Sequence, residues 1–109
     1  MSYRAPLCVP VELRHDGRSR WFRLTTRIGE EALVLAQIFP EELDGPVDVA
    51  FHLPGDPAPI RCHGRAAEEV IGEGEDQRAE RRIIRFVDLQ PEGRARIANY
   101  ITERLGPFA

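Results

Sequence analysis

Alternating apolar and polar residues predict a series of short strands along most of the chain. In residues 8–14 and 19–28 apolar side chains recur at every second position, which is the period of a half-buried strand. An Asp-Gly pair between these stretches is typical of a tight turn, so we expect a hairpin. The side chains expected to point from the second strand into the core are those of Phe22, Leu24, Thr26 and Ile28.

Four further stretches are predicted to be strands. They are residues 31–37, 47–53, 60–71 and 80–89. Residues 31–37 contain good helix formers, but the flanking Gly29 and Pro40 favour a short strand there. The side chains expected on the core side of residues 60–71 are small, which suits a tight barrel, and are those of Ile60, Cys62, Gly64, Ala66 and Val70.

Residues 91–105 have the period of an amphipathic helix. Pro91 suits the first helical turn, and Gly106 followed by proline suits the end. The apolar stripe expected to lie against the barrel consists of Ile97, Tyr100, Ile101 and Leu105.

The order of these elements predicts a mainly β fold. Six short strands followed by one helix, with no βαβ alternation, favour a six-stranded antiparallel barrel with one C-terminal α-helix. The length of 109 residues suits a single domain, residues 1–109. We expect a lead segment at residues 1–7, the barrel at residues 8–89 and the helix at residues 91–105.

The charge balance disfavours two classes of partner. The formal net charge is -3, so no excess of positive charge is available for a nucleic-acid polymer or an anionic membrane surface. No apolar run approaches the ~20 residues of a membrane-spanning helix, so membrane insertion is not expected. All 15 basic residues are arginines, whose planar guanidinium groups leave a local anion site possible.

Two cysteines and the lack of a secretory signal predict a cytoplasmic protein with reduced thiols. Cys8 and Cys62 lie far apart in the sequence, which is weak evidence for a disulfide. Cys62, His63 and His52 could suggest zinc, but strand alternation points the first two to opposite faces. We expect no metal and no cofactor.

No nucleophile or phosphate-loop motif is present, so catalysis is not expected. A binding surface is suggested instead by an outward face of residues 19–28 that carries Trp21, Arg23, Thr25 and Arg27. Tryptophan beside arginine is typical of a binding hot spot, although a loop or the helix could instead cover Trp21. The acidic segment 73–76 could be a recognition loop or simply a solvated hairpin end.

The chain resembles the PilZ family from Arg4 to Leu105 in strand order and length. The most specific part is the run Ile-Arg-Phe-Val-Asp-Leu at residues 84–89, directly before a helix. The resemblance implies a barrel with a C-terminal helix and, in many members, a receptor for cyclic di-GMP. Those receptors carry RxxxR before the first strand and [D/N]xSxxG between the second and third strands.

Both motifs are degenerate in this sequence. Arg4 occupies the first arginine position, whereas the other four motif positions hold Cys8, Arg27, Gly29 and Ala32. Each missing charge-assisted hydrogen bond costs about 1.5–3 kcal/mol, so the absence of two weakens binding roughly a hundredfold or more.

The resemblance therefore predicts an adaptor that has lost cyclic di-GMP binding. We expect it to act through a protein partner in bacterial motility, pilus assembly or related regulation, with Trp21, Arg23 and Arg27 as contact residues. The alternative is a receptor for cyclic di-GMP or another nucleotide, in which Arg4 and Arg27 serve an altered pocket.

Overall fold

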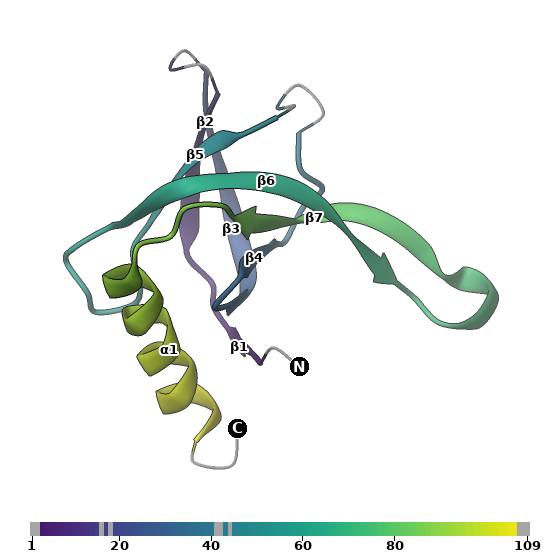
Figure 1. Cartoon of the computed structure of the whole chain (residues 1–109). Helices are drawn as coiled ribbons and strands as arrows, with labels where there is room; N and C mark the ends of the chain where they lie inside the picture. Colours follow the sequence, from purple (N-terminus) through teal and green to yellow (C-terminus); the bar gives the residue numbers. More distant parts are fainter. Residues whose placement is uncertain (1–2, 16, 18, 41–42, 44, 107–109) are drawn as a thin grey trace.

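The computed structural model describes residues 3–15, 17, 19–40, 43 and 45–106. Within these residues strands dominate the first four fifths of the chain, and one long α-helix ends it (Figure 1). In chain order the elements are β1 (Arg4–Pro6), β2 (Pro10–His15), β3 (Ser19–Gly29), β4 (Ala32–Leu35), β5 (Val47–Phe51), β6 (Ile60–Ile71), the 3-10 helix η1 (Gly74–Asp76), β7 (Arg78–Phe86) and α1 (Pro91–Leu105).

The strands form one antiparallel sheet that closes on itself. Their order is β1-β3-β2-β5-β6-β7-β4, and a further pairing of β3 with β4 closes the six strands β2 to β7 into a barrel. Closure matters because it leaves few strand edges open to other chains. The predicted fold class, a mainly β six-stranded barrel with one C-terminal helix, is confirmed.

Strand β1 is an addition that the sequence pattern missed. It lies in the predicted lead segment and pairs with β3 through Ala5 and Ile28, on the edge of β3 that β2 pairs with further along. Three residues ending in a proline are too few to show a strand period. The consequence is that Arg4 belongs to the sheet instead of to a loose arm.

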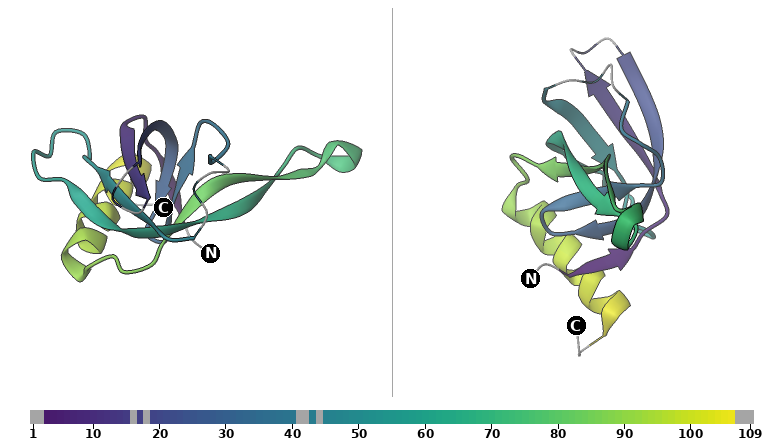
Figure 2. Two further views of the ribbon diagram at one scale, coloured as in Figure 1. Left: turned by 90° about the horizontal axis from the view of Figure 1, so that it is seen from above. Right: turned by 90° about the vertical axis from the view of Figure 1, so that its right-hand side faces the viewer.

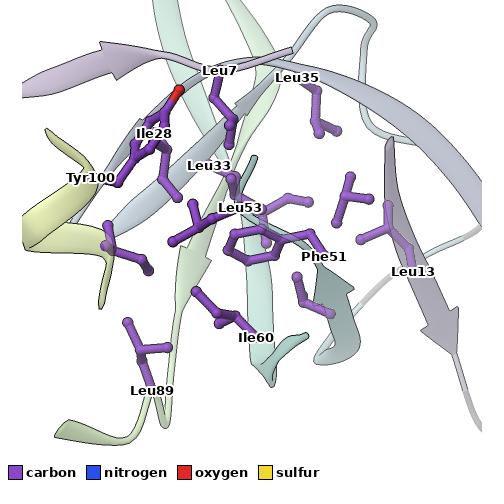
Figure 3. Close-up of a cluster of buried hydrophobic side chains, with 14 of the residues drawn as sticks. Leu7, Leu13, Ile28, Leu33, Leu35, Phe51, Leu53, Ile60, Leu89 and Tyr100 are labelled. Carbon is purple, nitrogen blue, oxygen red and sulfur yellow. The ribbon is translucent and has the colours of Figure 1, made fainter. Parts of the chain in front are cut away.

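The core fills the barrel and continues under α1 (Figure 3). Ile97, Tyr100 and Ile101 are buried, as the helical stripe predicts, and they join the same cluster as Leu33 and Phe51. The Tyr100 hydroxyl donates a hydrogen bond of 2.6 Å to the carbonyl oxygen of Pro6. Helix α1 therefore fastens β1 to the barrel. No helix in the described part of the chain is long and apolar enough to cross a membrane.

The predicted inward face of β3 is wrong as far as Thr26, whose side chain is exposed. Phe22 and Leu24 are 58% and 52% exposed, whereas Thr25 is only 1% exposed. Ile28 is buried as predicted, because a register shift between Thr25 and Arg27 in the pairing with β4 changes the phase of the strand. A bulge inserts one residue, so alternation read backwards from Ile28 selects the wrong face.

Strands β6 and β7 extend beyond the barrel as a two-stranded arm, residues 67–82 (Figure 2). Strand β5 pairs with β6 only as far as Gly64, and β4 pairs with β7 only at residues 83–85. Val70, predicted to face the core, is 65% exposed because it lies on this arm, past a register shift at Ala67. The predicted loop at residues 72–77 contains η1.

Candidate functional site

Two arginines at motif positions meet on the outer surface of the barrel. The pairing of β1 with β3 sets Arg4 opposite Gly29 and Pro6 opposite Arg27. Both guanidinium groups then reach one carboxylate oxygen: Arg4 Nη1 lies 3.1 Å and Arg27 Nη2 3.2 Å from Glu69 Oε1. The sequence prediction named both arginines but missed Glu69, which lies on the arm and comes close only through the tertiary fold.

The surface around these arginines is an open hollow of about 530 Å³. Its lining residues are Tyr3, Arg4, Arg27, Glu31 and Arg85. Three guanidinium groups would attract an anion, but the carboxylate of Glu31 lies 3.6 Å from Arg4 Nε. Together with Glu69, two carboxylates offset most of the positive charge at this site.

Small residues leave room for neighbouring side chains at the hollow. At Gly29 a Cβ atom would lie 3.2 Å from Arg4 Cγ and 3.0 Å from the carboxylate of Glu31, so a larger residue would crowd both. Ala32 is fully buried and forms a second apolar cluster with Val34 and Ile83. Gly29 and Ala32 therefore support the site as spacers and have no side-chain group that could contact a ligand.

Cys8 is not brought into the hollow. Its thiol is exposed, and the segment around it is fastened to β3 by Thr25. The Thr25 hydroxyl donates a hydrogen bond of 2.7 Å to the Leu7 carbonyl oxygen and accepts one of 3.0 Å from the Val9 N–H group. Of the five motif positions, the structure thus gathers Arg4, Arg27, Gly29 and Ala32 and leaves Cys8 aside.

The predicted outward face of β3 differs from the observed one. Trp21 is partly buried and packs against the main core, and Thr25 is fully buried, so these two side chains point inward. The guanidinium carbon of Arg23 lies 5.2 Å from the centre of the Trp21 ring, which is a cation–π contact. Partner binding by Trp21, Arg23 and Arg27 stays a prediction. Because Trp21 is partly buried, only the exposed edge of its ring could take part.

A second polar cluster, which the sequence prediction missed, surrounds His63 on the outer face of β5 and β6. His63 Nε2 lies 2.9 Å from Asp48 Oδ1, and Nδ1 lies 2.5 Å from Asp88 Oδ2. These carboxylates raise the pKa of His63, chiefly through the hydrogen bond to Asp88, and the pKa of Asp88 is lowered chiefly by the hydrogen bond from the His63 backbone N–H group and then by the one to the ring. Nδ1 is thus held in a hydrogen bond to Asp88, and Nε2 lies in an ion pair with Asp48. Asp48 lies directly opposite His63 in the pairing of β5 with β6. The sequence alone does not reveal this strand register, so the cluster was missed.

The neighbouring Cys62 has the character of a structural thiol. It packs against the core, and burial raises its pKa to about 12. A protonated thiol is a poor nucleophile and a poor metal ligand. Among the residues that the structure describes, no group of three or more His, Cys, Asp or Glu side chains could hold a metal ion.

Comparisons with solved structures place this fold. No family model matches the sequence, and no curated protein matches it significantly. The inhibitor of motility MotI/DgrA from Bacillus subtilis superposes with a TM-score of 0.69 at 10% identity, over 96% of this chain and 50% of that one. The PilZ domain of YcgR from Escherichia coli, solved with c-di-GMP, gives 0.63 at 12% identity over 95% and 89%.

A third similar structure is MrkH, described as a c-di-GMP-dependent transcription regulatory factor. It gives a TM-score of 0.65 at 12% identity, over 95% of this chain and 50% of that one. The chain therefore spans about half the length of MotI/DgrA and of MrkH. At such low identity these likenesses establish the fold, which is that of a PilZ domain.

Proposed function

We propose that this chain is a non-catalytic signalling adaptor of the PilZ fold that binds a protein partner and has lost cyclic di-GMP binding. Its place would be bacterial motility, pilus assembly or related regulation in the cytoplasm, and an inhibitor of motility shares its fold. The observation that carries the proposal is the shared carboxylate oxygen of Glu69, to which both Arg4 and Arg27 are hydrogen-bonded.

The ion pairs at this site work against a doubly phosphorylated ligand. A phosphate could use Arg4 and Arg27 only by displacing Glu69, and it would then lie near two carboxylates that repel it. The second arginine position holds Cys8, whose exposed thiol lies outside the hollow. Each charge-assisted hydrogen bond is worth about 1.5–3 kcal/mol, so a ligand that lacks two of them binds roughly a hundredfold more weakly or worse.

Isothermal titration with cyclic di-GMP tests this proposal. The wild-type chain is expected to give no measurable binding, because Glu69 occupies both arginines. In Glu69→Gln the carboxylate charge is removed, so weak binding should become detectable. The matched control is Glu68→Gln, which removes the same charge at an exposed neighbour. Wild-type binding tighter than about 10 µM would overturn the proposal.

The protein-partner half of the proposal needs its own experiment. Purified chain immobilised through its C-terminus should capture a partner from the native cell lysate. Arg23→Glu should abolish this capture if the partner contacts Arg23 and the exposed edge of the Trp21 ring. Phe22→Ser changes the opposite, exposed face of the same strand and is the control. If neither variant changes what is captured, β3 is not the partner surface.

A specific observation favours the second candidate, a nucleotide receptor with an altered pocket. Tyr3 is 54% exposed and lines the hollow together with Arg4 and Arg85. An aromatic ring beside guanidinium groups is the combination that binds a nucleobase and its phosphates. The same titration separates the candidates, because only a receptor would bind before Glu69 is changed.

A further inference from the structure

Two arginines lie directly opposite each other at the base of the arm. Arg65 on β6 is directly opposite Arg85 on β7, and both side chains are exposed. Within the described part of the chain neither guanidinium group forms an ion pair. Like charges directly across two strands destabilise a sheet, so this pair would gain from an acidic partner.

The tip of the same arm carries the opposite charge. Glu73, Glu75 and Asp76 are all exposed, and their carboxylates form no ion pair with any described residue. Gly72 and Gly74 have positive φ angles of 91° and 59°, which allow the chain to reverse tightly here. The turn therefore presents three carboxylates at the end of a long ribbon.

The side of the arm is also suited to contact. Strand β6 has no neighbour other than β7 beyond Gly64 among the described residues, so its backbone edge at residues 65–71 is open. Val70 is 65% exposed and lies opposite the exposed Ala79. A two-stranded ribbon is marginally stable by itself, and an open edge is a template for another strand.

The acidic tip and the basic base cannot meet within one molecule. They lie at opposite ends of an arm that points away from the barrel, separated by roughly 25–30 Å at about 3.3 Å per residue (Figure 2). Two such arms laid antiparallel bring each tip to the base of the other. The resulting contact has two-fold symmetry and closes after two copies.

We propose that two copies of this chain dimerise through antiparallel packing of their β6–β7 arms. The acidic tip of each arm then lies against Arg65 and Arg85 of the other copy. This inference does not depend on the proposed loss of cyclic di-GMP binding, because the charges that it uses at the tip and at Arg65 lie outside the hollow, which the arm shares only through Glu69 and Arg85.

Sedimentation velocity of the purified chain tests the dimer. A concentration-dependent dimer is expected at about 50 mM NaCl and a weaker one at about 500 mM NaCl, because salt screens exposed charges. Reversing the charge at the base of the arm with the double substitution Arg65→Glu and Arg85→Glu should raise the dissociation constant of the dimer at least tenfold. Reversing the charge at the tip with the double substitution Glu73→Arg and Glu75→Arg should raise this dissociation constant to a similar extent.

Mixing the two reversed variants gives the decisive result. Each variant alone places like charges at both contacts, whereas in a one-to-one mixture both contacts pair opposite charges, so a heterodimer should form. The matched control is Arg94→Glu, which reverses an exposed charge on α1 and should dimerise like the wild type. Circular dichroism verifies that every variant is folded.

Three outcomes would overturn the proposal. They are a wild-type chain that stays monomeric at every concentration in low salt, reversed variants that dimerise as well as the wild type, and a mixture of folded variants that stays monomeric. The tip variants change only exposed loop residues, so they remain informative even if the base variants fail to fold.

Discussion

The Thr25 hydroxyl is the group that holds the N-terminal segment on the barrel, and replacing it with a methyl group tests how that segment is positioned. Thr25 is 1% exposed, and its hydroxyl contacts both the Leu7 carbonyl oxygen and the Val9 N–H group. Thr25→Val keeps the shape of the side chain but leaves both backbone groups without this partner. The segment that carries Arg4 to its site should then detach more easily.

The expected loss of stability follows from the Leu7 carbonyl oxygen and the Val9 N–H group, which both lose their hydrogen-bond partner. An unsatisfied buried donor or acceptor costs about 1–3 kcal/mol, and valine leaves no cavity that would add to it. We therefore expect Thr25→Val to lower the free energy of unfolding by about 2 kcal/mol. For a domain of this size that corresponds to a fall in Tm of roughly 8–16 °C.

Urea denaturation followed by circular dichroism measures this loss. The matched control is Thr26→Val on the next residue, whose side chain is exposed and whose hydroxyl lies 3.4 Å from the Val34 carbonyl oxygen. That change should stay within about 0.5 kcal/mol. The reasoning is refuted if Thr25→Val matches the wild type within that margin, or if Thr26→Val is equally damaging.

Two further predictions concern the barrel wall. Gly64→Ala should lower the free energy of unfolding by about 1–3 kcal/mol in urea, because the new Cβ atom would lie 2.6 Å from Ile84 Cγ2; a variant as stable as the wild type contradicts this. The raised pKa of His63 means that its ion pairs stabilise the fold fully below about pH 6.5 and that this contribution disappears as pH rises through the folded pKa. An NMR titration of the His63 ring should show a midpoint above about 6.5 that falls in Asp88→Asn, and an unchanged midpoint counts against the pairing with Asp48 and Asp88.

The sequence pattern located most elements because strand and helix periods are local properties. The alternation over residues 60–71 matches β6, and the four-residue repeat beginning at Ile97 matches the buried face of α1. Local patterns failed where the alternation of buried and exposed residues shifts by one position. At Thr25 the bulge moves the buried side to the other set of residues, and the composition of β3 contains no sign of it.

The candidate site shows the same division. The sequence by itself identified Arg4, Arg27, Gly29 and Ala32 as positions of the candidate site, because the motif spacing is short. Only the tertiary structure decided that Glu69, 65 residues from Arg4, lies between the two guanidinium groups. Which carboxylate meets which arginine depends on strand register and on the curvature of the arm. Those features arise from the packing of segments distant along the chain, and no local spacing encodes them.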